Sequence, residues 1–432
     1  MSRAREAGFR ATYGRLLRNR PLRRLLAGEF ISSLGDAMYL VAFVVVIYRE
    51  THDPILLGAV AAARQLPFAL LSIPAGALVD RFDRRVVLLV TDVLKGLAML
   101  GLASLVAGGA PIAPIAALAV GSAILSTAFW PAIWAYIPGL VEDERDLGPA
   151  NSALATLDNV AWILGPILAG VILAVGDASV PFLINAITFA LMAVVLWTLP
   201  TASARQSQPE PGLRLELAPL PPGIDRRALA GLVVLAVVTA FAVAGVNILI
   251  VVLVVDVFRA GDGVTGFLNA AVGLGGTFGA ILSGVVVLRP RFGRSLLVAG
   301  FGMAAAAAAL GVANSAPLAF VAITAMSAGN LVLEVIRTTV LQRLVPDSHI
   351  GRFSGLLLTA AMGAEVVGTV LVPAAVPVLS IAWVFVLIAG AIAFGASLAI
   401  WLIRGAGDNF GRKWPVLASS AQPQFPAQER QA

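Results

Sequence analysis

The sequence predicts an all-α polytopic membrane protein, and two observations carry that prediction. Hydrophobic residues make up 59% of the 432 residues and charged residues only 12%, which is far from the balance of a soluble globular chain. Apolar stretches of roughly 20 residues, long enough to cross a ~30 Å hydrocarbon core as helices, recur along the whole chain. Twelve transmembrane helices are predicted, at residues 25–48, 55–79, 86–106, 114–138, 150–175, 180–199, 228–255, 265–288, 295–313, 317–344, 353–377 and 382–403.

The twelve predicted helices fall into two groups of six. Residues 200–227 are polar and rich in proline, which is typical of a linker. We expect this cytoplasmic linker to join an N-terminal bundle at 25–199 to a C-terminal bundle at 228–403. Residues 1–24 form a strongly basic cytoplasmic segment, and residues 404–432 are predicted to form a disordered cytoplasmic tail.

The second half of the chain repeats features of the first at a constant offset. The segment GAVAAARQLPFALLSIPAGALVD aligns without a gap with GFLNAAVGLGGTFGAILSGVVVL, so that Gly58 matches Gly266 and Gly76 matches Gly284. Parallel repeats of six helices are typical of transporters whose binding site lies between the two halves, near the middle of the membrane. The repeat therefore predicts two pseudo-symmetric bundles and alternating access by rocking.

Basic residues are concentrated on one side of the predicted membrane, and positively charged loops are retained in the cytoplasm. Both termini lie on that side and are therefore predicted to be cytoplasmic. The opposite loops offer only Arg49 and Arg259. The preference for arginine over lysine indicates a GC-rich bacterial genome, so we expect the cytoplasmic (inner) membrane of a bacterium. Beyond the basic N-terminal segment, the cytoplasmic side carries Arg81, Arg84, Arg85, Arg205, Arg214, Arg226, Arg227, Arg289, Arg291, Arg294, Arg352, Arg404, Arg412 and Lys413.

The composition does not support catalysis, a resident metal or nucleic-acid binding. The chain has no cysteine and only two histidines, His52 and His349, so a metal site built from these residues is not expected. It lacks a G-x-x-x-x-G-K-[ST] phosphate loop, and its basic residues are scattered among loops rather than gathered in one patch. We therefore expect no catalytic residue, no cofactor, no metal and no nucleic-acid partner.

The loop between the second and third spans carries a dense charge cluster, GALVDRFDRR at residues 76–85. It resembles the signature loop of the major facilitator superfamily, G-x-L-x-D-R-x-G-R-R, with Asp83 where the pattern has glycine. The tripeptide LGD at 34–36 and the segment LVPDSHIGR at 344–352 look like the branch that contains enterobactin-type siderophore exporters and macrolide-efflux proteins. The resemblance implies the two-bundle major facilitator fold and transport driven by a proton gradient.

The charge cluster is also predicted to work as a latch between the two bundles. Asp80 ends the second span, where its carboxylate can accept hydrogen bonds from exposed backbone N–H groups at the start of a neighbouring helix. In the resembled family that partner is the start of span eleven, near residues 351–353. Acidic residues after span four are the expected partners of Arg84 and Arg85. The alternative is that the arginines only fix the topology. The predicted latch comprises Gly76, Asp80, Arg81, Arg84, Arg85, Glu142, Asp143 and Glu144.

The fifth span contains AWILGPILAG at 161–170, which resembles the family's exporter motif, G-x-x-x-G-P-x-x-G-G, with alanine at two glycine positions. The matching residues are Gly165, Pro166 and Gly170. Small residues allow close helix approach and proline can bend a helix, so the resemblance implies tight packing on the outer side and transport out of the cell. Ordinary small-residue packing of membrane helices is the alternative.

Ionisable residues within the spans are expensive in lipid and are therefore functional candidates. Asp36 and Glu365 lie near the middle of their spans and are the first choices for binding a proton or a cationic substrate. Arg64 is expected to neutralise Asp36 or to meet an anionic substrate, and Asp158 is a further candidate. Glu29 lies close enough to the membrane interface to need no function.

Two pairs of opposite charges are spaced three residues apart, which places each pair on one helical face. Asp92 with Lys95 and Glu334 with Arg337 are predicted to form structural or gating ion pairs. Aromatic residues in the spans, such as Trp130, are candidates for the lining of an apolar cavity.

The sequence therefore favours a proton-coupled antiporter that exports a bulky amphipathic small molecule, such as a drug, a macrolide or a siderophore, by alternating access. A transporter of lysophospholipid or another lipid with the same fold is the first alternative. A receptor-like or structural membrane protein that transports nothing is the alternative from another class. The expected partners are the substrate, protons and the lipid bilayer, and the chain is expected to be a monomer.

Overall fold

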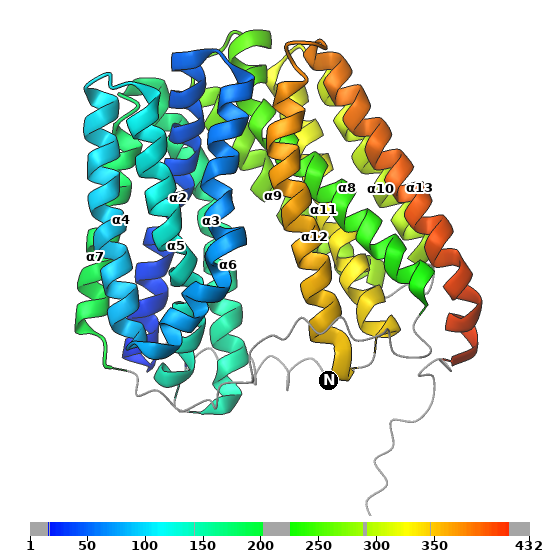
Figure 1. Cartoon of the computed structure of the whole chain (residues 1–432), viewed down its shortest axis with the longest axis horizontal. Coiled ribbons are helices and arrows are strands. Elements are labelled where there is room, and N and C mark those ends of the chain that lie inside the picture. Colours follow the sequence, from blue (N-terminus) through cyan, green and yellow to red (C-terminus); the bar gives the residue numbers. More distant parts are fainter. Residues whose placement is uncertain are drawn as a thin grey trace, which may run out of the picture.

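The computed structural model describes residues 16, 18–141, 143–201, 225–287, 292–345 and 347–413. This part of the chain contains twelve helices long and apolar enough to cross a membrane, which confirms the predicted fold class (Figure 1). Most of the predicted linker at 200–227 and most of the basic segment at 1–24 lie outside the described residues.

The N-terminal bundle consists of six long helices and a short 3-10 helix, η1 (Glu144–Asp146). Asn19 caps the first long helix by accepting a hydrogen bond from the backbone N–H of Leu22 (3.0 Å), and its amide donates to the carbonyl oxygen of Leu140 (2.8 Å). The cap therefore ties the first long helix to the end of the fourth. The long helices are α2 (Arg20–Thr51), α3 (Pro54–Arg81), α4 (Arg84–Ala107), α5 (Ile112–Leu140), α6 (Leu147–Val175) and α7 (Val180–Thr198).

The C-terminal bundle also has six long helices, and a π-helical turn, η2 (Leu253–Val257), extends the first of them. The last helix continues to Lys413, into the segment predicted as a disordered tail, although its apolar part ends at Ile403. Hydrophobicity alone placed the end too early, because a helix satisfies its backbone hydrogen bonds internally and can continue outside the membrane. The long helices are α8 (Arg226–Val252), α9 (Gly263–Val287), α10 (Phe292–Gly311), α11 (Ala316–Leu344), α12 (Asp347–Ala374) and α13 (Ile381–Lys413).

The helices pack in the same pairs within the two bundles. In the N-terminal bundle α2 packs against α6 and α7, α4 packs against α5 and α7, and α3 packs against α5. The corresponding pairs in the C-terminal bundle are α8 with α12 and α13, α10 with α11 and α13, and α9 with α11. Contacts between the bundles follow the same rule, since α6 packs against α9 and α12 packs against α3. The structure thus has the internal symmetry that the sequence repeat predicts.

Two glycines that the repeat matches make close approaches between the bundles. A Cβ atom on Gly58 of α3 would clash with the carbonyl oxygen of Thr369 in α12, and one on Gly266 of α9 would clash with the carbonyl oxygen of Pro166 in α6. Any side chain at these positions would push the helices apart. The equivalence of Gly58 and Gly266 in sequence is therefore also an equivalence in packing.

The bundles approach one another at one end and diverge at the other (Figure 1). We call the end with the first residues of α2 and the last residues of α13 the termini side, and the opposite end the far side. On the far side the backbones of α6 and α9 are in contact around Gly170 and Gly263. On the termini side Gly76 and Gly284, also matched by the repeat, have open space where a Cβ atom would lie. The bundles are therefore in contact on the far side and apart on the termini side.

Candidate functional site

A cavity of about 200 Å³ lies within the N-terminal bundle, and the five helices α2 to α6 contribute its lining. Glu29, Ser33 and Asp36 reach it together because their spacing of four and three residues places them on one face of α2. The cavity brings together three of the predicted binding residues, Asp36, Arg64 and Asp158. The lining residues are Glu29, Ser33, Asp36, Tyr39, Leu40, Arg64, Phe68, Lys95, Ser122, Ala123, Ser126, Phe129, Trp130, Asp158 and Trp162.

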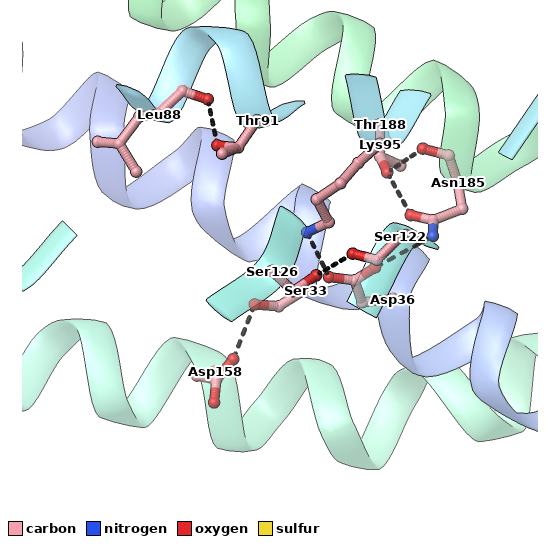
Figure 2. A network of polar contacts seen from close by, with 10 residues as sticks. All are labelled: Ser33, Asp36, Leu88, Thr91, Lys95, Ser122, Ser126, Asp158, Asn185 and Thr188. Carbon is pink, nitrogen blue, oxygen red and sulfur yellow. Dashed lines mark hydrogen bonds and ion pairs between the residues drawn. The ribbon is translucent and has the colours of Figure 1, made fainter. Parts of the chain in front are cut away.

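Asp36 is the centre of a polar network that joins three helices (Figure 2). Its Oδ2 atom lies 3.4 Å from the ammonium of Lys95 on α4, and its Oδ1 atom accepts a hydrogen bond of 3.1 Å from Asn185 on α7. The hydroxyl of Thr188 lies 2.8 Å from the backbone carbonyl oxygen of Asn185 and 3.0 Å from its Oδ1 atom. The Asp36 side chain is 35% exposed. Its carboxylate is therefore held by protein donors while it still faces the cavity.

Lys95 is buried between aromatic rings. Its ammonium lies 4.1 Å from the centre of the Phe189 ring and 5.0 Å from that of Phe129, where the ring faces attract a cation. The predicted ion pair of Lys95 with Asp92 is absent from this conformation, because the lysine reaches across to Asp36 instead. Spacing along one helix missed this partner, since it takes no account of charges on a neighbouring helix.

Two further carboxylic acids lie close to this network. Asp92 is fully buried, and neither of its oxygens has a hydrogen-bond partner among the described residues. Glu29 is 3% exposed, and its Oε2 atom likewise has none in this part of the chain. Glu29 was expected to lie close to the membrane interface, but it is buried within the bundle. Its place on the inner face of α2 carries it into the bundle and to the cavity.

The remaining charged residues of the cavity come from α6 and α3. Asp158 accepts a hydrogen bond of 2.7 Å from Ser33 Oγ (Figure 2). The guanidinium of Arg64 lies over the Tyr39 ring, 5.9 Å from its centre. The prediction that Arg64 neutralises Asp36 is wrong in this conformation, because Lys95 takes that place. A role of Arg64 toward an anionic substrate stays a prediction.

Two of the predicted acidic residues lie in the C-terminal bundle, outside this cavity. Glu365 is exposed on α12, one turn from Thr369, whose hydroxyl lies 3.4 Å from the amide of Gln65 on α3. Arg337 Nη2 lies 3.9 Å from Glu334 Oε1, which is the predicted pairing. The two carboxylates chosen first from the sequence are thus on different bundles and do not share this cavity.

The charged loop between α3 and α4 is built from local interactions. Asp83 caps α4, because its Oδ1 atom accepts hydrogen bonds from the backbone N–H groups of Arg85 (2.8 Å) and Val86 (3.4 Å). Glycine has no side chain for this task, which explains the departure from the family pattern at this position. Arg85 donates from Nε to the carbonyl oxygen of Leu196 (2.8 Å) and from Nη2 to that of Trp197. It therefore holds α4 against the last turn of α7.

Of the acidic residues after α5, the structure describes the side chain of Asp143, and this residue is not the predicted partner of Arg85 in this conformation. Asp143 accepts a hydrogen bond from the backbone N–H of Arg145 (2.9 Å) instead. The physical reason is that the free carbonyls at the end of α7 offer acceptors within the same bundle. Glu142 and the side chain of Glu144 lie outside the described residues.

The rest of the predicted latch lies apart from the other bundle. Asp80 and Arg81 are exposed at the end of α3, and a Cβ atom on Gly76 would meet nothing within 4 Å. Within the described ranges, no hydrogen bond joins Asp80 to α12. The latch stays a prediction for a conformation in which the termini side is closed.

The far side carries contacts that the sequence reading missed. Tyr48 at the end of α2 donates a hydrogen bond to Asp256 in η2, and Arg49 donates to Asp262 before α9. We call these four residues the far-side clasp. Tyr48 and Asp256 are 208 positions apart, which is the offset of the sequence repeat. Equivalent positions of the two bundles therefore meet here. The sequence contained a signal for this contact: polar residues at the span ends that are separated by the offset of the repeat.

The residues of the exporter-like motif pack in two directions. Gly165 lies against the backbone of α2 at Leu34, within the N-terminal bundle, whereas Gly170 lies against Gly263 and Gly266 of α9. Pro166 is inside α6 and is followed by further helix. The motif therefore serves close packing, and its relation to the direction of transport stays a prediction.

In the described part of the chain, twelve helices long and apolar enough to cross a membrane form two symmetric bundles, which is the architecture of a polytopic membrane protein. The sequence pattern of the Major Facilitator Superfamily matches residues 25–292. The chain belongs to this family, which confirms the resemblance carried by its charged loop.

Curated relatives include exporters. The chain is 32% identical over 171 residues to the putative bacilysin exporter BacE of Bacillus amyloliquefaciens, a match that covers 39% of this chain and 42% of BacE. It is 28% identical over 186 residues to the multidrug efflux pump Tap of Mycobacterium tuberculosis strain ATCC 25618 / H37Rv, covering 42% of this chain and 44% of Tap. Each match thus spans less than half of the relative's own length.

Solved structures show the same fold. A bacterial homologue of the human lysosomal transporter Spinster, in an inward-facing and unoccupied conformation, superposes with a TM-score of 0.67 at 15% identity. The match covers 89% of this chain and 97% of that one. At this identity the likeness concerns the fold alone.

Proposed function

We propose that the protein is a proton-coupled antiporter that exports a bulky, cationic amphipathic small molecule. One observation carries this proposal: a single cavity is lined by carboxylates and by aromatic rings. Asp36 and Asp158 supply negative charge, and Phe129, Trp130 and Trp162 supply apolar surface. This combination suits a molecule with a positive charge and an apolar body.

The size of the cavity adds detail to the proposal. Its volume of about 200 Å³ is below the roughly 300–1,000 Å³ of pockets that enclose a drug-sized ligand. The cavity therefore receives the charged group of the substrate, and the apolar body extends toward the space between the bundles. A site of this kind tolerates different apolar bodies, as expected for efflux of several compounds.

The arginine distribution supports the direction of transport. Positively charged loops remain in the cytoplasm, so the termini side faces the cell interior in this proposal. The described conformation is then open to the cytoplasm and closed toward the outside, the state in which an exporter takes up its substrate. The exporter and efflux functions named for BacE and Tap agree with this direction.

Proton coupling follows from carboxylates inside the membrane. A carboxylate that binds a cation can instead be neutralised by a proton, so the two compete for the same group. Protons that enter from the outside would then displace the substrate on that side. A proton gradient directed inward would thereby drive export.

Transport into inverted membrane vesicles tests the proposal, with ethidium as the cationic probe. Vesicles with an acidic interior should accumulate ethidium only when they contain the protein, and nigericin, which collapses the pH gradient, should abolish the accumulation. Accumulation that survives collapse of the pH gradient contradicts proton antiport. If neither ethidium nor tetraphenylphosphonium accumulates, the cationic substrate class is contradicted. The lipid transporter and the receptor-like protein then remain as alternatives.

A matched pair of variants separates the cavity from general effects of charge. Asp36→Asn should lower ethidium accumulation by about tenfold, since a contact with a charged group contributes about 1.5–3 kcal/mol. Asp177→Asn, in an exposed turn where the aspartate accepts a hydrogen bond from the backbone of Ser179 (2.7 Å), should leave it unchanged. Equal accumulation by the two variants would remove Asp36 from the site.

A further inference from the structure

Three carboxylic acids of the N-terminal bundle surround one lysine. Lys95 pairs with Asp36 on α2, whereas Asp92 lies one turn away from the lysine on α4 itself. Glu29 of α2 lines the same cavity as Lys95 and Asp36. A single ammonium group is thus the nearby counter-ion for acids from two helices.

The surroundings of these acids set their charge. Burial of an ionised carboxylate without donors costs several kcal/mol, much more than burial of the neutral acid. Asp36 accepts from Lys95 and Asn185 and faces the cavity, so it can remain ionised. Asp92 is fully buried, with no donor on either oxygen among the described residues. Its neutral, protonated form is therefore the less costly one in this conformation.

We propose that Asp92 carries the transported proton and that Lys95 is a counter-ion shared in turn by Asp92 and Asp36. The inference rests on the proposed function, because it assigns the proton and the substrate of that function to two different acids. Asp36, chosen from the sequence for either task, becomes the substrate carboxylate. Asp92, expected from the sequence to be structural, becomes the proton carrier.

The exchange works through charge balance. When the proton leaves Asp92 toward the termini side, the new carboxylate attracts the ammonium of Lys95, which is three residues along the same helical face. Asp36 then loses its ion pair and offers its charge to a cation in the cavity. When a proton returns to Asp92, Lys95 goes back to Asp36 and displaces the bound cation. One proton is released for each positive charge bound, so the charge of the buried cluster stays constant.

The neighbouring helices limit where Lys95 can move. The rings of Phe129 on α5 and Phe189 on α7 flank its ammonium. The charged groups facing Asp92 are Lys95 on its own helix and Asp36 and Glu29 on α2. Rotation of the lysine side chain between two acids, within an aromatic enclosure, therefore needs no movement of a helix.

Infrared spectroscopy of the full-length protein in lipid nanodiscs tests the assignment without substrate or gradient. A protonated carboxylic acid has a C=O stretching band that a carboxylate lacks. At neutral pH the wild-type protein should show a component of this band that disappears in Asp92→Asn and remains in Glu29→Gln. Survival of all components in Asp92→Asn, or loss of that component in Glu29→Gln, overturns the assignment. Asparagine resembles the neutral acid in shape and polarity, so Asp92→Asn is expected to fold.

The shared counter-ion has its own readout. Removal of the cation in Lys95→Gln should make the Asp92 band persist to more alkaline pH, because no ammonium is left to stabilise the carboxylate. An unchanged titration of the band would contradict the shared lysine. In addition, Asp92→Asn should weaken ethidium binding and abolish its pH dependence, since Lys95 then stays on Asp36. Retention of the wild-type pH profile would contradict the exchange.

The two proposals fail separately. The infrared band requires neither transport nor a ligand. Its absence would reject the proton assignment while ethidium efflux could still be measured. Conversely, the protein could show the Asp92 band while vesicles containing it fail to accumulate ethidium. That result would reject the efflux function alone.

Discussion

The far side and the termini side of the interface use equivalent positions of the sequence repeat, yet they are in opposite states. Gly58 and Gly266 press against the backbone of the other bundle, whereas Gly76 and Gly284 have open space beside them. The helices of the two pairs are the same, α3 and α9. The difference teaches that the same two helices close the interface at one end and leave it open at the other.

The polar groups at the two ends differ in the same way. On the far side Tyr48 and Arg49 bind acids of the C-terminal bundle. On the termini side Asp80 is exposed, and Arg85 is engaged by α7 within its own bundle. The far-side clasp therefore stabilises the described conformation, while Asp80 of the predicted latch is exposed and available for the other one.

The largest expected effect comes from the packed glycine on the far side. Gly266→Leu places a side chain against the backbone of α6, and overpacking of this kind costs about 1–3 kcal/mol or more. The far-side-closed state should be depleted. Spin labels on cysteines at Ser104 and Ser315, in a chain without native cysteine, should report a longer distance by double electron–electron resonance.

The matched control is Gly284, which lies on the same helix, α9, at the termini side. Gly284→Leu enters open space in this conformation, so the distance between the same labels should remain that of the wild type. An unchanged distance in Gly266→Leu, or an equal lengthening in both variants, would contradict the contrast between the two ends.

A smaller effect is expected from the clasp tyrosine. Tyr48→Phe removes one hydrogen bond to a charged group and should cost the far-side-closed state about 1–2 kcal/mol. The same label pair measures the shift. Tyr136→Phe is the control, because Tyr136 donates to the carbonyl oxygen of Pro200 (2.7 Å) inside the N-terminal bundle. It should lower the melting temperature without changing the label distance, and a shift as large as that of Tyr48→Phe would show that the clasp has no special part.

The two aspartates of the charged loop on the termini side should differ in their effect on stability: Asp83 stabilises the fold, whereas Asp80 does not. Asp83→Ala loses the cap of α4 and should lower the free energy of unfolding by about 1 kcal/mol, measured by thermal melting in detergent. Asp80→Ala should leave the melting temperature unchanged, because Asp80 is exposed, and should impair transport only. Equal destabilisation by the two variants would contradict this division.

The smallest effect is expected at the rim of the clasp. Arg49 has 47% of its side chain exposed in its pair with Asp262, and exposed ion pairs contribute only about 0–1 kcal/mol. Arg49→Ala should therefore shift the label distance less than Tyr48→Phe does. High salt should remove the difference between Arg49→Ala and wild type. If Arg49→Ala changed the label distance more than Tyr48→Phe does, the Arg49–Asp262 pair would contribute more than the Tyr48–Asp256 hydrogen bond, which contradicts the expected order.

Much of the architecture could be predicted because it depends on hydrophobicity and repetition. The twelve spans follow from the length of their apolar stretches, and the offset that matches Gly58 with Gly266 implies the symmetric packing. The end of α13 at Lys413 was missed, since backbone hydrogen bonds and not apolar side chains determine where a helix stops.

The candidate site was only partly predictable, because its contacts join residues far apart in the chain. The depth of Asp36 in its span made it a first choice for binding a proton or a cationic substrate; it does line the cavity, and the binding role stays a prediction. Its partners Lys95 and Asn185 come from two other helices, and spacing within α4 suggested Asp92 instead. Glu29 was set aside because distance along a helix does not reveal which face points inward.

The most direct test of the account measures both ends of the interface in one preparation. One label pair, at Ser104 and Ser315, spans the far side, and a second, at Thr198 and Gln342, spans the termini side. A pH change that lengthens the far-side distance should shorten the termini-side distance, and the reverse change should restore both. Lengthening of both distances together, or a change at one side alone, would contradict alternating closure of the two ends.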